Sequence, residues 1–224
     1  MLNLDQNSPS QSWLAGALEQ FDTDNDPMAR RTRSLLNQIV SKPAVHSRFA
    51  NTLSMLEHMG SYKIMSTQHS AAIDQPTLKH VAEEAQHAYF MKRQAEKIAS
   101  RPLQYRTDDL LAPASARMFF RRLEVSVMKL LREQGSTDAA YLYLSMIVEF
   151  RALWFYRTYQ QILKRIAHPM SLKRVIGEEE NHLHDMAERL EAAGELSNAR
   201  STTFLNHERA LFEQLLDALH KAIA

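Results

Sequence analysis

Apolar residues recur along most of the chain at three- and four-residue intervals, which place them on one face of an α-helix. The C-terminal segment shows this spacing at Phe204, Leu205, Leu211, Phe212, Leu215 and Leu219. No segment sustains the alternation of apolar and polar residues that is typical of a half-buried strand. The pattern therefore predicts an all-α protein.

Prolines and capping residues divide this pattern into seven predicted helices. Asp26-Pro27 is typical of an N-cap followed by the first helical position, and Asp74 precedes another helix in the same manner. Gly135 and Gly194 are placed to end helices. We expect one helical domain over residues 26–224, with residues 1–25 as a loosely ordered N-terminal segment. The predicted helices cover residues 27–40, 44–69, 74–100, 114–134, 138–166, 171–193 and 201–222.

Composition then excludes several classes of function. The chain has 224 residues with 27 Lys and Arg against 26 Asp and Glu, so its net charge of +1 gives no reason to expect nucleic acid or an anionic membrane as a partner. It has no Cys, which excludes disulfides, thiolate metal sites and iron–sulfur clusters. Its five glycines form no phosphate-binding loop. We see neither a signal peptide nor a long apolar run, so we expect a cytoplasmic protein.

Two of the predicted helices carry the same local motif. The first contains Glu83-Glu84-Ala85-Gln86-His87, and the second contains Glu178-Glu179-Glu180-Asn181-His182. A Glu and a His three residues apart project about 60° apart around a helix and lie one turn from each other. Each helix can therefore offer a carboxylate oxygen and an imidazole nitrogen to one metal ion.

Two further glutamates lie on the helices that precede these motifs. Glu149 stands in the most apolar predicted helix, where a lone carboxylate costs several kcal/mol unless it is paired or bound to a metal. Glu57 precedes Glu84 along the chain much as Glu149 precedes Glu179. Each half of the sequence is thus a helix with one Glu, a turn, and a helix with Glu-x-x-His.

At this point the sequence resembles the ferritin-like di-iron carboxylate superfamily, in which four antiparallel helices hold two metals. The resemblance covers residues 44–193 and implies a four-helix bundle with about three additional helices. It also implies that Glu83 and Glu178, which precede the bridging-type carboxylates, orient the opposite His. The metal ligands that it implies are Glu57, Glu84, His87, Glu149, Glu179 and His182.

The resemblance implies a di-iron or iron–manganese oxidase or oxygenase that uses O₂ to oxidise a small organic substrate. The ligands would hold two Fe ions, with Mn as the other metal that such donors suit. A separate electron donor or the substrate would supply electrons, and an enzyme would be a monomer or homodimer. Nucleic acid and membrane partners are not expected. The alternative is an iron-handling protein, either a ferroxidase with storage or a peroxide-removing protein, and a metal-free helical interaction module is a third hypothesis.

Several positions keep a second interpretation from sequence alone. Glu149 could instead form a buried ion pair with Arg151 or Arg157, and Glu57 could be a surface residue. His80 lies one turn before Glu84 and could reach the site.

Four tyrosines and two glycines on the metal-bearing helices also stay open. The tyrosines are core-packing candidates, none of which is preferred as a site residue: Tyr62, Tyr89, Tyr143 and Tyr156. Gly60 and Gly177 stand inside helices, where Gly costs about 1 kcal/mol relative to Ala. We therefore expect close approach or an open pocket beside the ligands.

Overall fold

The computed structural model describes residues 9–67, 73–136 and 139–224. These residues form no strand, so the predicted all-α class is confirmed, and each predicted helix corresponds to one observed helix. The predicted cap at residues 137–138 and the predicted helix end at 68–69 lie outside the described residues. The helices are α1 (Pro9–Val40), α2 (Pro43–Thr67), α3 (Gln75–Ala99), α4 (Pro113–Glu133), α5 (Ala140–Arg165), α6 (Lys173–Ala192) and α7 (Asn198–Ile223), with a 3₁₀ turn, η1, at Thr107–Asp109.

The predicted helix boundaries are confirmed at the best-defined caps. The Asp74 carboxylate accepts a hydrogen bond from the Thr77 backbone N–H at 2.8 Å, which satisfies one of the free donors at the start of α3. Gly135 and Gly194 have φ angles of +71° and +68° just beyond α4 and α6, a conformation that favours glycine.

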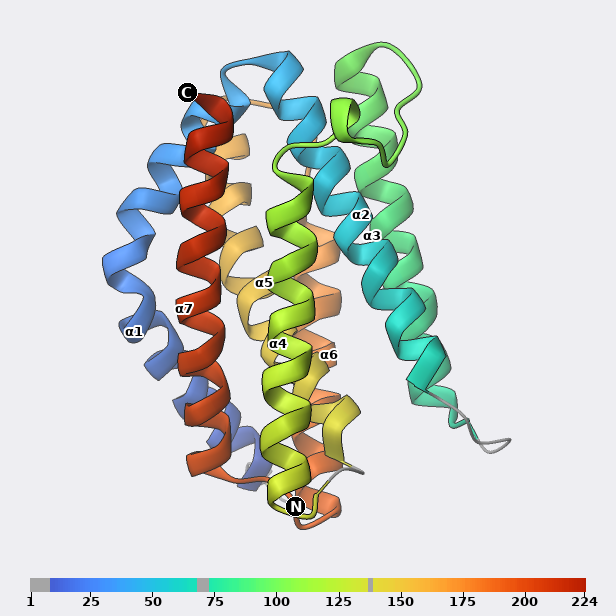
Figure 1. Cartoon of the computed structure of the whole chain (residues 1–224), viewed down its shortest axis with the longest axis vertical. Coiled ribbons are helices and arrows are strands. Elements are labelled where there is room, and N and C mark those ends of the chain that lie inside the picture. Colours follow the sequence, from blue (N-terminus) through green and yellow to red (C-terminus); the bar gives the residue numbers. More distant parts are fainter. Residues whose placement is uncertain (1–8, 68–72, 137–138) are drawn as a thin grey trace, which may run out of the picture.

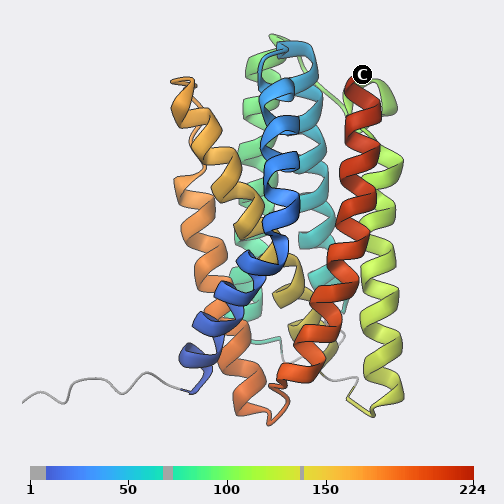
Figure 2. The ribbon, with the colours of Figure 1, turned by 90° about the vertical axis from the view of Figure 1, so that its left-hand side faces the viewer.

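The helices run roughly along the long axis of the molecule (Figure 1). Helices α2 and α3 form one antiparallel hairpin, α5 and α6 form a second, and α4 packs against α7. Helix α1 crosses α5, α6 and α7 on the opposite side from α3 (Figure 2). In α5, 16 of 26 residues are buried, so this helix is the centre of the apolar core. None of the helices, over the residues described, has the length and apolar character needed to cross a membrane.

The expected start of the first helix at Asp26-Pro27 is wrong, because α1 begins at Pro9 and Pro27 lies inside it. Leu14 and Phe21 are buried, each 2% exposed, so residues 9–25 are not a loosely ordered segment. The helix changes direction near its middle (Figure 2), as expected where a proline removes one backbone donor. Apolar packing of the first half therefore outweighs the local cost of the proline.

A buried ion pair ties three helices together beneath this packing. The Arg151 Nε and Nη2 atoms donate to the two Glu208 carboxylate oxygens at 2.8 and 2.7 Å, and Nη2 also donates to Asn25 Oδ1 at 2.7 Å. The aromatic ring of Phe212 covers the guanidinium at 4.0 Å. These contacts of Arg151 join α1, α5 and α7.

The buried first half of α1 leads to a stability prediction. Replacing Phe21 with Ala should lower the free energy of unfolding by about 3–5 kcal/mol, because it removes a ring that contacts Phe150 at 5.5 Å between centroids. Replacing the exposed neighbour Asp22 with Ala should change it by less than about 0.5 kcal/mol. Denaturant unfolding measures both values, and an equally small effect of Phe21→Ala would contradict this packing.

Candidate metal centre

The structure brings all six predicted ligands together in the interior. They come from four helices, with Glu57 on α2, Glu84 and His87 on α3, Glu149 on α5, and Glu179 and His182 on α6. They form two groups of four side chains, in each of which the potential ligand atoms lie within 4.8 Å of one another. Glu84 belongs to both groups, and His80 completes one of them.

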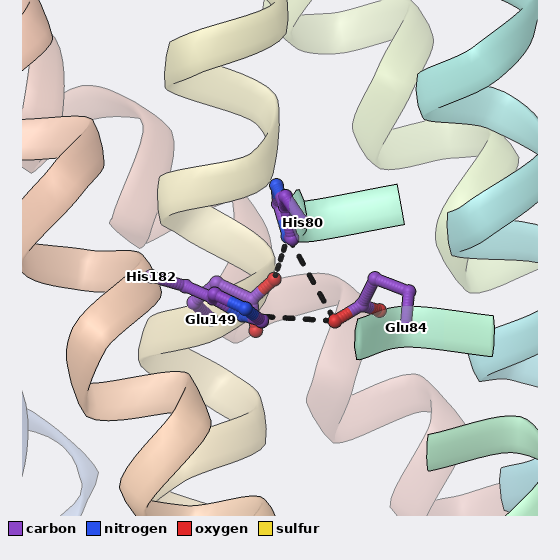
Figure 3. A group of neighbouring side chains, drawn as sticks. All are labelled: His80, Glu84, Glu149 and His182. Atoms are coloured by element: carbon purple, nitrogen blue, oxygen red, sulfur yellow. Dashed lines mark hydrogen bonds and ion pairs between the residues drawn. The ribbon is translucent and has the colours of Figure 1, made fainter. Parts of the chain in front are cut away.

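The first group contains two histidines and two glutamates. His80 Nε2 lies 3.4 Å from Glu149 Oε1 and 3.8 Å from Glu84 Oε1, and His182 Nδ1 lies 3.7 Å from the same Glu84 oxygen. Figure 3 shows these side chains converging from α3, α5 and α6. Two imidazole nitrogens and two carboxylates are a ligand set that suits Fe, Mn or Zn.

The second group is richer in carboxylates, because it contains Glu57, Glu84 and Glu179 with one histidine, His87. His87 Nδ1 lies 3.3 Å from Glu179 Oε1 and 3.5 Å from Glu84 Oε1. Glu57 is 8% exposed, so the interpretation of this residue as a surface glutamate is wrong. The two groups share one carboxylate, which would allow Glu84 to contact two adjacent metal ions.

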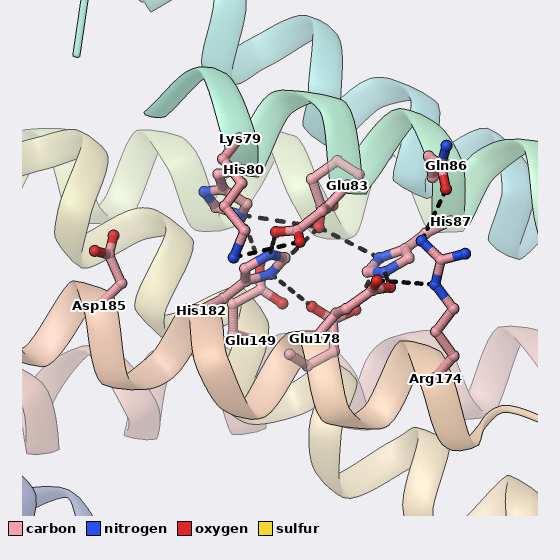
Figure 4. A network of polar contacts seen from close by, with 12 residues as sticks. Lys79, His80, Glu83, Gln86, His87, Glu149, Arg174, Glu178, His182 and Asp185 are labelled. Atoms are coloured by element: carbon pink, nitrogen blue, oxygen red, sulfur yellow. Dashed lines mark hydrogen bonds and ion pairs between the residues drawn. The ribbon is translucent and has the colours of Figure 1, made fainter. Parts of the chain in front are cut away.

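Glu83 and Glu178 hold the opposite histidines from outside the site. His182 Nε2 on α6 lies 3.0 Å from Glu83 on α3, and His87 Nε2 on α3 lies 2.9 Å from Glu178 on α6. Figure 4 shows this exchange between the two helices. An outer carboxylate fixes the ring orientation and leaves the inner nitrogen as the donor for a metal. The predicted contacts of both acids with the opposite His are therefore present.

His80 and Tyr156 are the residues that sequence reasoning left undecided. His80 Nδ1 lies 2.9 Å from the Tyr141 hydroxyl, so this ring too has an outer partner and an inner nitrogen. Tyr156 donates to Glu57 Oε1 through its hydroxyl. The signal for both was helical spacing, because His80 is one turn from Glu84 and Tyr156 is two turns from Glu149. Sequence could not show which side chains of neighbouring helices meet them.

The other sequence-based alternatives are resolved by the contacts. Arg151 pairs with Glu208, and Arg157 pairs with Glu180 at 2.8 Å, so neither is the partner of Glu149. Of the four tyrosines considered, Tyr62 and Tyr89 are more than 60% exposed. The hydroxyl of Tyr143 donates to the Glu195 carbonyl, away from the cluster.

Burial in an apolar interior and repulsion between neighbouring carboxylates disfavour negative charge on two glutamates of the cluster. Burial, and then the nearby carboxylates, raise the pKa values of Glu57 and Glu149 well above the usual range. Burial alone would also raise the pKa of Glu179, but its contacts with His182 and His87 lower it. Divalent ions would take over the charge compensation that protons supply here, so metal binding would release protons.

Unpartnered atoms show that the residues fit a metal. In the described part of the chain, six buried side-chain nitrogen or oxygen atoms have no hydrogen-bond partner, and three belong to this cluster. These three are Glu84 Oε1, His87 Nδ1 and Glu179 Oε1. Buried polar groups are normally paired, and both carboxylate oxygens lie within 3.5 Å of His87 Nδ1, close enough for the three atoms to share one metal ion in the second group.

An apolar cavity borders the carboxylate side of the cluster. Its volume is about 110 Å³, and Glu57, Glu84, Glu149 and Gly60 form its polar end. A Cβ atom at Gly60 would stand 3.2 Å from Glu84 Oε2, so the expected close approach is present there. At Gly177 a Cβ would meet nothing within 4 Å, so close approach is wrong for this glycine and the space beside it is open.

Comparison with known proteins adds no relative. No protein-family model, curated protein or solved structure matches this chain. The geometry of the cluster and of the cavity is therefore what indicates a function for this protein.

The crossed acid–histidine pairs lead to a prediction about metal affinity. Glu83→Gln and Glu178→Gln should each weaken metal binding by about 10- to 100-fold, because each removes the carboxylate that orients a His. Glu180→Gln is the matched control, since Glu180 follows in the same run but pairs with Arg157 at the surface. Competition titration with a metal chelator measures the affinities, and equal affinity in all three variants would contradict the orienting role.

The two helical glycines provide a second matched pair. Gly177→Ala should raise the free energy of unfolding by up to about 1 kcal/mol and leave metal affinity unchanged, because its Cβ enters open space. Gly60→Ala should weaken metal binding, because its Cβ displaces the Glu84 carboxylate. Thermal unfolding of the metal-free proteins and metal titration separate the two effects. Unchanged metal affinity in Gly60→Ala would show that Glu84 can move without cost.

Proposed function

We propose that this protein is a di-metal carboxylate oxidase or oxygenase that holds two Fe ions, with Mn as the alternative, and oxidises a small organic substrate with O₂. The observation that carries the proposal is a buried cluster of four Glu and three His whose unpartnered atoms face inward beside an apolar cavity. The ferritin-like resemblance is part of the proposal, with α2, α3, α5 and α6 as its four-helix core. His80 departs from the ligand set that the resemblance implies.

Each residue has a distinct role in this proposal. Glu84 would bridge the two metals because it is common to both groups of ligands. Glu57 would bind the metal of the second group in an orientation fixed by the Tyr156 hydroxyl. Bound Fe(II) ions would supply the electrons that reduce O₂.

The apolar cavity favours an organic substrate over iron storage as the function. The cavity beside the three ligand carboxylates is lined almost entirely by aliphatic and aromatic side chains, which suit an organic molecule better than an iron ion. Such a cavity concentrates O₂ and an apolar substrate and keeps water away from the reacting atoms. The electrons for each turnover come from the substrate or from a separate donor.

Metal content and O₂ uptake test this proposal. The wild-type protein should bind two Fe(II) ions per chain and consume O₂ faster than free Fe(II). Glu84→Ala should lose both ions, because it removes the shared ligand, and His182→Ala should lose the ion of the first group. His184→Ala, an exposed histidine on the same helix, is the control and should retain both.

Anaerobic Fe(II) titration and an oxygen electrode provide these measurements. Two-ion binding in Glu84→Ala would overturn the site. A large hollow assembly that accumulates mineral iron, in place of a monomer or homodimer, would overturn the oxidase in favour of iron storage.

A further inference from the structure

The cavity beside the carboxylates is long and narrow. Its wall on α2 follows one helical face from Phe49 to Gly60, which corresponds to a length of about 16 Å at the rise of an α-helix. A volume of about 110 Å³ spread over that length gives a cross-section that is wide enough for only one extended alkyl chain. By the volume that one buried water needs, the cavity holds the equivalent of about nine waters. Because a methylene group is about as large as a water molecule, the same volume holds an alkyl chain of about eight to ten carbons.

Two helices outside the proposed four-helix core, α4 and α7, build about half of the remaining wall, and α5 builds most of the rest. Helix α4 contributes Phe119 and Phe120, and α7 contributes Phe212, Leu215 and Leu219. The rings of Phe119 and Phe212 meet at 6.3 Å between centroids, which closes the cavity between these two helices. Helices α4 and α7 therefore form the outer wall of a chamber that ends at the ligand carboxylates.

The one cation and the hydroxyl of Thr52 in the chamber lining are engaged with protein groups. The Arg151 guanidinium is neutralised by Glu208, and its face is covered by Phe212. The Thr52 hydroxyl donates to the Arg48 carbonyl and accepts from the Leu111 N–H. Among the residues that line the chamber, Arg151 is the one cation, and its charge is balanced by Glu208, so we expect the segment of a ligand that lies there to be uncharged.

A second cavity continues from the same end toward polar side chains. It shares Gly60, Glu84 and Glu149 with the chamber and is also lined by Lys63 and Glu124. Lys63 Nζ contacts Glu124 at 2.9 Å, and both side chains are partly exposed, so this pair lies at the rim. A molecule that enters here would pass the ligand carboxylates before its apolar end reaches Phe49.

From these observations we infer that the substrate is a linear alkyl compound of about eight to ten carbons. Its chain lies in the chamber formed by α2, α4, α5 and α7, and its polar end lies toward Lys63. This inference rests on the proposed function for the reaction, but the binding of the chain depends only on the shape and lining of the chamber.

Binding of 1-alkanols tests the chamber without turnover. Calorimetric titration from 1-hexanol to 1-dodecanol, on metal-free and Zn(II)-loaded protein, should show affinity rising about fourfold per methylene and levelling off near eight to ten carbons. The compact ten-carbon alcohol 1-adamantanol should bind at least about tenfold more weakly than 1-decanol. Equal or tighter binding of 1-adamantanol would overturn the linear chain.

Two variants should move the preferred chain length in opposite directions. Ala152→Leu narrows the chamber and should shift the levelling point to shorter alcohols, whereas Leu219→Ala enlarges the chamber and should shift it to longer ones. Ala192→Leu, at an exposed position on α6, should leave it unchanged. Opposite shifts cannot arise from general destabilisation, and an unchanged levelling point in both chamber variants would overturn the inference.

The same titrations separate this inference from the proposed function. If the protein binds no metal but shows the chain-length profile, the inferred chamber stands and the proposed oxidase is wrong. If the protein binds two metal ions but shows no chain-length profile, the proposed metal centre stands and the inferred linear substrate is wrong.

Discussion

The rest of the structure depends on the cost of burying four carboxylates and three imidazoles inside an apolar bundle. Isolated charges in such an interior cost many kcal/mol, so they persist only where partners compensate them. Here the compensation crosses between helices, with Glu83 reaching His182 and Glu178 reaching His87. These crossed pairs fix α3 and α6 side by side in one register, because a shift by one residue would break both.

Helix α5 carries two separate networks of charged groups, and the need to compensate each buried charge keeps them apart. Glu149 faces the cluster, while Arg151, two positions later, faces Glu208 and Asn25 on the other side of the helix. Because two residues along a helix project about 160° apart, α5 can supply a ligand on one face and an anchor for α1 and α7 on the other. If Arg151 had paired with Glu149 instead, both the cluster and the packing of the outer helices would be lost.

Local spacing explains why so much of the site could be predicted from sequence. The relation of Glu84 to His87 and of Glu179 to His182 is fixed within one helix, and the high cost of an unpaired Glu149 in an apolar segment indicates a ligand. Contacts between helices were not accessible in this way, so the Tyr156 contact with Glu57 and the inclusion of His80 stayed open. The start of α1 was wrong for a related reason: Asp26-Pro27 has the local chemistry of a helix start, but the packing of Phe21 and Leu14 decides the outcome.

The two sides of the cluster are chemically different, and in the proposed oxidase this difference would decide where reaction occurs. Crossed acid–histidine pairs close the side formed by α3 and α6, and none of the three histidines lines either of the cavities beside the ligands. Only the carboxylates Glu57, Glu84 and Glu149 face the apolar chamber. Carboxylates can change their mode of coordination more easily than histidines held by outer partners. Under the proposed function, ligand rearrangement and substrate approach would therefore occur on the same side, with the chamber between α2 and α5 as the place where they meet.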